Sequence, residues 1–151
     1  MNYPVYESKA KYDMWLKVLL GGVVALTFVI GLSEVVWGGE EALTVFGTVL
    51  FEIVLYWLIM PRRFQITSDK LRIVLGGPLA FNIAPSEIEE ARSRTGTAAF
   101  IYFGTRFATS ASHTVEIVRG RGRNMVISPS DDEEFIKQLN QAIQAVKQEG
   151  T

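Results

Sequence analysis

The chain has 151 residues, of which 48% are apolar and 21% charged, so its composition excludes a disordered protein. Its formal net charge of −1 lacks the basic excess of a typical nucleic-acid-binding protein, and we expect no nucleic-acid partner. No cysteine is present, which excludes a disulfide framework and thiolate metal sites. The length suits one domain with an appendage.

Two long apolar stretches, residues 14–32 and 42–60, predict a hairpin of transmembrane helices. Each is close to the roughly 20 residues that an α-helix needs to cross about 30 Å of hydrocarbon. A buried helix pair in a soluble core is the alternative, but neither stretch has a polar face of normal width, and the rest of the chain is too short to cover both. A signal peptide over residues 14–32 is a further alternative, which the missing A-x-A-like cleavage site disfavours.

The distribution of basic residues predicts the orientation of this hairpin. The connecting segment, residues 33–41, contains no Lys or Arg, whereas basic residues flank both spans. The flanking residues are Lys9, Lys11, Lys17, Arg62, Arg63, Lys70 and Arg72. The positive-inside rule therefore predicts an integral protein of the cytoplasmic (inner) membrane, with a cytoplasmic tail over residues 1–13, the hairpin over 14–60 and a cytoplasmic domain over 61–151.

A polar stripe runs along the second span at a spacing of four residues, which places its members on one helix face. The stripe consists of Thr44, Thr48, Glu52 and Tyr56. Eleven Leu, Ile, Val and Phe residues in the span favour insertion by about 3 to 7 kcal/mol, and a central acidic residue costs about 2.5 to 3.5 kcal/mol. The span therefore tolerates Glu52, which we expect to be protonated and to hydrogen-bond across the hairpin or across a dimer interface. A proton or ion relay through Glu52 is the alternative.

The second half of the chain alternates between apolar and polar residues in short runs, which predicts strands. The runs are "RRFQIT", "KLRIVLG", "LAFNIAP", "HTVEIV" and "NMVIS", and "SEIEEARSR" fits a helical turn or a strand. The segment from Ser130 to Gly150 predicts an amphipathic helix that begins with a capping box at Ser130 and Glu133. Antiparallel strands followed by one helix are typical of an α+β domain.

Two quoted segments carry a resemblance to a known family. "PRRFQITSDKLRIVLGGPLAFNIAPSEIEEAR" and "MVISPSDDEEFIKQL" resemble the bacterial pleckstrin-homology-like domains of small membrane proteins. The resemblance extends over about residues 61–146. It implies a bent antiparallel sheet or barrel of seven strands capped by a C-terminal helix, and it brings no catalytic residues to this chain.

Two groups of basic residues are candidate contacts for lipid or for a partner. Arg63, Lys70 and Arg72 loosely match the positions that phosphoinositide-binding relatives use, although juxtamembrane residues that set topology and touch anionic lipid have the same pattern. Arg119, Arg121 and Arg123 lie in "RGRGR", which fits either a phosphate-binding or acid-binding patch or a solvated hairpin turn.

A third candidate is the aromatic segment from Thr95 to His113. It forms part of a strand and a loop, or it inserts into the membrane interface or docks a partner, since aromatic residues with Arg suit both surfaces. Its candidate contact residues are Phe100, Tyr102, Phe103, Arg106 and Phe107.

No enzyme signature or metal-ligand cluster accompanies these residues, so we expect no catalytic residue, cofactor or metal. The expected function is that of a membrane-anchored interaction or scaffold module that recruits or organises partners at the cytoplasmic face. The expected partners are membrane lipid and a protein partner or further copies of the chain. A small ion- or proton-coupled membrane component acting through Glu52, or an anionic-lipid sensor, is the alternative.

Overall fold

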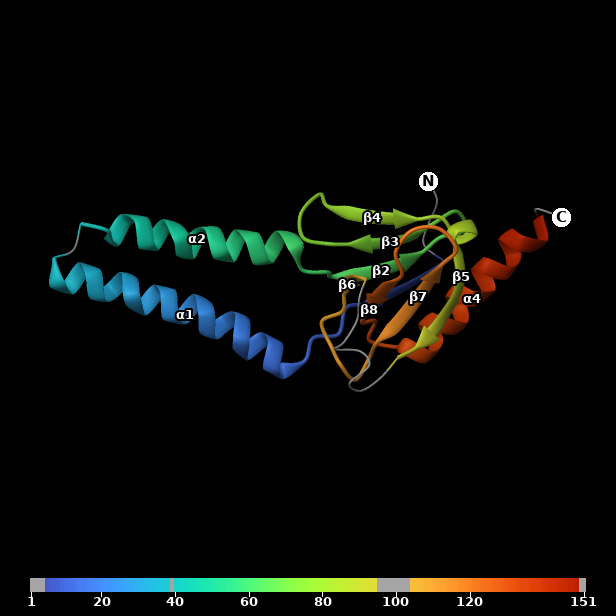
Figure 1. Ribbon diagram of the computed structural model, residues 1–151, viewed down its shortest axis with the longest axis horizontal. Coiled ribbons are helices and arrows are strands. Elements are labelled where there is room, and N and C mark those ends of the chain that lie inside the picture. The colour runs from blue at the N-terminus through green and yellow to red at the C-terminus, as the bar shows by residue number, and fades with distance from the viewer. Residues whose placement is uncertain (1–4, 39, 95–103, 150–151) are drawn as a thin grey trace.

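The computed structural model describes residues 5–38, 40–94 and 104–149, and in these ranges it consists of a helical hairpin attached to one end of a β-domain. The hairpin contains helices α1 (Met14–Trp37) and α2 (Ala42–Ile59). Figure 1 shows both helices projecting from the same side of the domain, with the strands and helix α4 (Asp132–Glu149) at the opposite end of the long axis.

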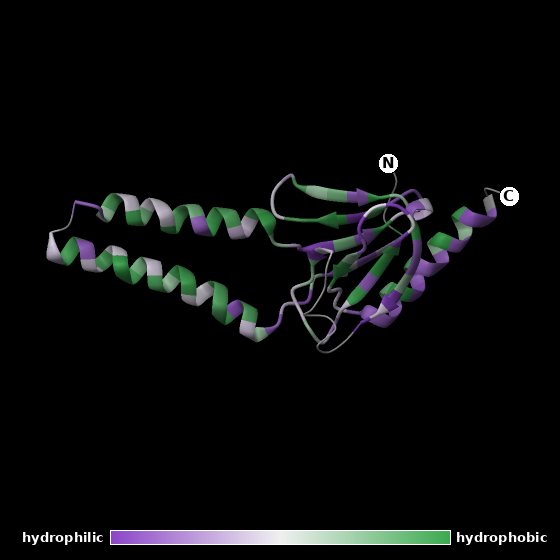
Figure 2. Ribbon diagram, in the orientation of Figure 1, coloured by the Kyte–Doolittle hydropathy of each residue, from purple (hydrophilic) through white to green (hydrophobic). Residues whose placement is uncertain are grey.

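Both helices of the hairpin are long and apolar enough to cross a membrane. Apolar side chains cover nearly every face of them, and most of these side chains are exposed outside any protein core (Figure 2). Helix α1 continues to Trp37, beyond the predicted end at Leu32, and stops at Gly38, whose φ of 71° is the left-handed conformation that glycine adopts readily. The predicted connecting segment of residues 33–41 is therefore shorter than expected, because α1 occupies its first half.

The first sheet contains strands from both sides of the hairpin. Its order is β1-β2-β3-β4, and all its pairs are antiparallel. The strands are β1 (Tyr6–Lys9), β2 (Arg63–Ile66), β3 (Leu71–Val74) and β4 (Ala80–Ile83). The sequence pattern predicts a tail without a strand over residues 1–13, whereas β1 pairs with β2 along its whole length. The hairpin is thus an insertion between two neighbouring strands of one sheet.

The second sheet has the order β5-β7-β8-β6. Its strands are β5 (Ile88–Ser93), β6 (Thr105–Phe107), β7 (Val115–Arg119) and β8 (Met125–Ile127), and a short 3₁₀ helix, η1 (Pro85–Glu87), precedes β5. The segment "SEIEEARSR" therefore contains both of the predicted possibilities, a helical turn followed by a strand. The expectation of a wholly antiparallel sheet is wrong at one pair, because β6 runs parallel to β8.

Helix α4 closes the core between the two sheets, and the predicted α+β class is confirmed. Phe135, Leu139 and Ile143 on one face of α4 are buried against residues such as Phe64 and Ile117 of the two sheets. Each such side chain contributes about 1.5 to 3 kcal/mol of transfer free energy when fully buried.

The predicted capping box at the start of α4 is wrong. The helix begins at Asp132, and the N–H of Phe135 donates to the carbonyl of Asp131 at 2.9 Å. Ser130 instead ties α4 to the first sheet, because its N–H donates to the carbonyl of Lys9 at 2.8 Å.

Candidate functional site

Several long-range hydrogen bonds join the hairpin to the domain at their junction. Asp13, the residue before α1, accepts from the Ser110 hydroxyl at 2.6 Å and from the Ala111 N–H at 2.8 Å. Its own N–H donates to the carbonyl of Thr109 at 3.1 Å. Burial alone would raise the pKa of Asp13, but the hydrogen bonds from Ser110, Ala111 and Trp15 lower it overall, so the carboxylate stays ionised. Asp13 therefore fastens the start of α1 to the segment that follows β6.

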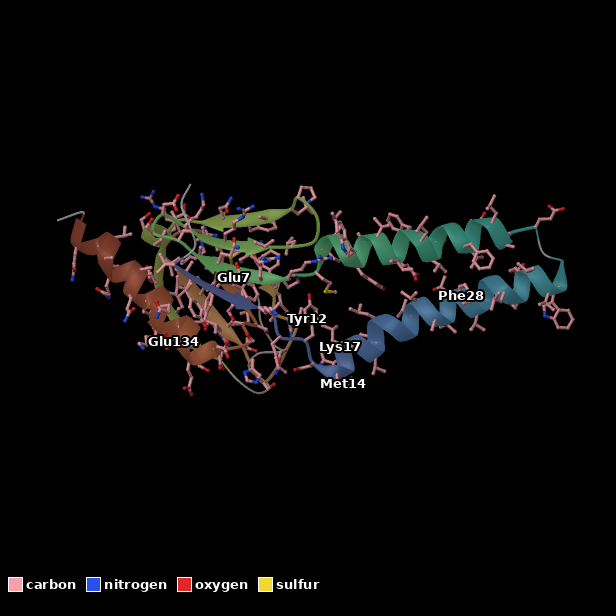
Figure 3. The ribbon with its side chains drawn as sticks, turned by 180° about the vertical axis from the view of Figure 1, so that it is seen from behind. Glu7, Tyr12, Met14, Lys17, Phe28 and Glu134 are labelled. Carbon is pink, nitrogen blue, oxygen red and sulfur yellow. The ribbon has the colours of Figure 1, made fainter. Side chains whose placement is uncertain are left out.

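The residues just before Asp13 extend this attachment to the second sheet and to the end of α2. The N–H of Lys11 donates to the carbonyl of Ser128 at 2.8 Å. The Tyr12 hydroxyl donates to the carbonyl of Pro61, which follows α2. Figure 3 shows Tyr12 at the point where α1 leaves the domain. The two chain segments that connect the hairpin to the sheet are thus joined to each other as well as to the domain.

The end of α2 is fastened separately, by the turn between β3 and β4. The N–H of Gly76 donates to the carbonyl of Leu58 at 3.2 Å. A Cβ on Gly76 would overlap the carbonyl oxygen of Trp57, so only glycine allows this approach. The guanidinium of Arg62 lies 4.9 Å from the centroid of the Trp57 ring, within the range of a cation–π contact.

A pocket of about 330 Å³ lies where the two helix ends meet the domain. Leu16 of α1 and Ile59 of α2 line it from the hairpin, and Arg106 and Phe107 of β6 line it from the domain. Phe107 also packs on Phe81 of β4, with ring centroids 5.0 Å apart. Since β4 and β6 are the last strands in the order of their sheets, this aromatic contact joins the two sheet edges beside the pocket.

Within the hairpin, Glu52 faces α1. Its Oε1 lies 3.2 Å from the Thr27 hydroxyl, and that hydroxyl also lies within donating distance of the Val23 carbonyl at 3.0 Å. Because a hydroxyl has one hydrogen, the Thr27 hydroxyl donates to one of these two oxygens at a time or shares its hydrogen between them. Glu52 Oε2 is buried and has no hydrogen-bond partner among the described residues.

The other members of the predicted polar stripe have different surroundings. Thr44 and Thr48 are exposed, and the Thr48 hydroxyl donates to the Thr44 carbonyl of its own helix at 3.0 Å. Tyr56 is half-buried and lines an apolar groove between α1 and α2. Glu52 and Tyr56 of the stripe therefore lie between the two helices, whereas Thr44 and Thr48 are exposed.

Arg63, Lys70 and Arg72 do not converge on one binding site for a lipid headgroup. Arg63 and Lys70 lie at opposite ends of the β2–β3 pair, and each has an acidic neighbour, Glu7 at 3.2 Å and Asp69 at 3.4 Å respectively. Arg72 is exposed in the middle of β3.

The arginine turn between β7 and β8 lies in the half of the domain away from the hairpin (Figure 1). Arg119 forms an ion pair with Glu87 of η1. Arg121 and Arg123 are exposed at the tip of the turn.

The predicted aromatic residues Phe100, Tyr102 and Phe103 lie outside the described residues.

Several contacts that hold the elements of the domain together could not be predicted from the sequence. The side-chain amide of Asn140 on α4 both accepts from the Ala91 N–H and donates to the Ala91 carbonyl, each at 3.1 Å, and so pairs with β5 as a strand would. Glu116 is buried and bonds to Arg92 and Arg94, each at 2.9 Å. Burial raises the pKa of Glu116, but its bonds to the two arginines lower it overall. A polar residue on an apolar helix face is the only signal in the sequence that could have indicated Asn140.

The bacterial PH domain family matches residues 62–142 of this chain. The chain belongs to the bacterial PH (pleckstrin-homology) domain family. This confirms the resemblance stated above, and the matched segment runs from the end of the hairpin into α4. Strand β1 lies outside it, although β1 completes the first sheet. Comparison with curated proteins and with solved structures finds no match.

Proposed function

We propose that this bacterial PH domain protein is an integral membrane protein that holds an interaction domain at a fixed position on the cytoplasmic membrane face and recruits a partner there. The observation that carries the proposal is the insertion of the hairpin between the paired strands β1 and β2. A domain on a flexible tether would need only one connection. This one is attached through both helix ends, by the bonds of Asp13, Tyr12 and Gly76.

The fixed attachment supports a presenting role because it determines which surface faces away from the membrane. The exposed tip of the arginine turn, Arg121 and Arg123, is on the far half of the domain (Figure 1). Two cations at a hairpin tip suit an acidic protein segment, since charge-assisted hydrogen bonds to carboxylates are about twice as strong as neutral ones. We therefore assign this turn to a protein partner instead of to the chain's own membrane.

The orientation is tested by labelling of single cysteines, which the cysteine-free chain makes straightforward. Glu40 lies in the connection between the helices, and Gln144 is exposed on α4. In intact cells, a membrane-impermeant maleimide should label Glu40→Cys, and it should label Gln144→Cys only after permeabilisation. Equal labelling of both positions in intact cells would contradict an inserted hairpin with a cytoplasmic domain.

Recruitment is tested by placing a photo-crosslinking residue at Arg121 of the full-length protein and, as a control, at the exposed Glu133 of α4. A discrete crosslinked protein at position 121 alone supports the proposal. Its yield should fall at high salt and in the variant with Arg123→Gln, because exposed charge pairs are screened. A crosslink only between copies of the chain would make the domain a self-association module, and no crosslink at 121 would remove the turn as a partner site.

A further inference from the structure

An apolar groove of about 630 Å³ separates α1 from α2 on the side of the hairpin nearest the domain. Its walls come from one face of each helix. They include Leu20, Val24 and Phe28 of α1 with Val49, Ile53 and Tyr56 of α2.

The two helices pack closely beyond the groove, on the side of the connection between them. There, Phe28 packs edge-to-face on Phe46 with centroids 5.8 Å apart, and a Cβ on Gly31 would lie 3.3 Å from the Phe46 ring. Figure 3 shows Phe28 between the two helices. Toward the domain the helix axes diverge (Figure 1).

The domain end of the groove lies one helical turn from the pocket at the junction. Leu16, one turn before Leu20, and Ile59, one turn after Tyr56, line that pocket together with Arg106. We refer to the groove and this neighbouring pocket together as the channel. Arg106, which is exposed on β6, lines its domain end. An apolar wall that leads to a cation at the membrane surface is complementary to a lipid with an anionic headgroup.

The length of this channel argues for a lipid and against a further helix. From Leu16 to Phe28 there are twelve residues of helix, which at 1.5 Å per residue span about 18 Å. One leaflet of hydrocarbon is about 15 Å thick, which is half of the core. A transmembrane helix from another chain would cross the full thickness, whereas the residues that line this channel end at Phe28, beside its contact with Phe46.

We propose that the channel binds one anionic phospholipid of the leaflet next to the domain, with an acyl chain between α1 and α2 and its phosphate beside Arg106. Bound there, the lipid fills the space between the diverging helices. Its headgroup meets the same β6 edge that Phe107 and Phe81 hold in place.

Native mass spectrometry of the full-length protein in mild detergent tests this proposal, with phosphatidylglycerol and phosphatidylcholine of identical acyl chains as probes. We expect one retained phosphatidylglycerol per chain and weaker retention of phosphatidylcholine. Arg106→Gln should lower phosphatidylglycerol retention about fivefold, the effect of one basic residue near an anionic surface, and leave phosphatidylcholine unchanged. Arg121→Gln, which removes a cation far from the channel, should have no effect.

The proposed contact between the acyl chain and the groove is tested by a second matched pair of variants. Gly21 lines the groove and Gly22 does not, and a Cβ at either position would meet no atom within 4 Å. Gly21→Leu should lower retention of both lipids severalfold, whereas Gly22→Leu should not. Equal retention in Arg106→Gln and Arg121→Gln, or in the two glycine variants, would overturn the site, as would a lipid-free dimer. If Gly21→Leu does not fold by circular dichroism, the arginine pair decides.

Discussion

Gly76, in the turn between β3 and β4, packs directly on the carbonyl of Trp57 in the last turn of α2. The contact joins a loop of the domain to a helix of the hairpin, and the Gly76 N–H donates to the adjacent Leu58 carbonyl. The Asp13 attachment holds the other helix, α1. The domain is therefore fastened to each helix by a separate contact.

We predict that Gly76→Ala detaches the turn from α2. The added methyl group meets backbone that cannot move aside, and we expect the free energy of unfolding of the domain in detergent to fall by about 1 to 3 kcal/mol. Thermal unfolding followed by circular dichroism measures this change. Gly47→Ala is the matched control, because a Cβ at Gly47 meets no atom within 4 Å. Equal melting temperatures for the two variants would show that the contact does not hold the domain.

Asp13→Ala should loosen the start of α1 without unfolding the domain. The Ala111 N–H loses its carboxylate acceptor, and the amide hydrogen of Ala111 should then exchange faster with solvent. Hydrogen exchange of the segment that contains Ala111 measures the effect, and the lost bonds correspond to about 1 to 3 kcal/mol. If the Asp13→Ala variant showed unchanged hydrogen exchange in this segment, the hydrogen bonds of Asp13 would not be needed to hold α1 against the domain.

Glu116 should make the domain sensitive to acid. Its pKa is lowered in the folded state, so its stabilising contribution is complete above its unfolded value of 4.5 and is lost as the pH falls through its lower folded pKa. We expect the free energy of unfolding to decrease below about pH 4.5, and Glu116→Gln to flatten that decrease while destabilising the protein at pH 7 by about 1 to 3 kcal/mol. Denaturation at a series of pH values tests this, with the exposed Glu133→Gln as the control that keeps the wild-type slope.

Asn140→Ala should destabilise the domain by about 1 to 3 kcal/mol, because it leaves both backbone groups of Ala91 without their partner. The exposed Gln144→Ala on the same helix removes a similar side chain without such a bond and should change stability by less than about 0.5 kcal/mol. Thermal unfolding of both variants makes the comparison. Equal effects would mean that the Asn140 pairing contributes nothing beyond helix propensity.

Glu52→Gln separates a packing role from a transport role. Glutamine keeps the shape of the side chain and can still bond to the Thr27 hydroxyl, so we expect no change in native mass or in the partner crosslink at position 121. Proton flux into liposomes should be the same for the wild type and the variant. A flux that the wild type supports and Glu52→Gln abolishes would favour the proton-coupled function over the scaffold.

Local patterns explain why much of the fold could be predicted. Two helices long and apolar enough to cross a membrane follow from length and composition, although α1 continues to Trp37, beyond its predicted end. Strands β2 and β3 and the buried face of α4 follow from alternation and from helical spacing. Each of these signals is carried by residues close together in the chain, as is the motif that resembles the family.

The junction, by contrast, was decided by the tertiary structure. Strand β1 reads "YESK", which has no clear apolar alternation, and it is a strand because β2 returns beside it after the whole hairpin. The hydrogen bonds of Asp13 with Ser110 and Ala111, of Tyr12 with Pro61 and of Asn140 with Ala91 join residues that are far apart in sequence. Such bonds depend on which elements the folded core brings together. Composition and periodicity therefore determined that this chain has two helices long and apolar enough to cross a membrane and a PH-type domain, and long-range pairing decided that the helical hairpin is inserted into the sheet of that domain.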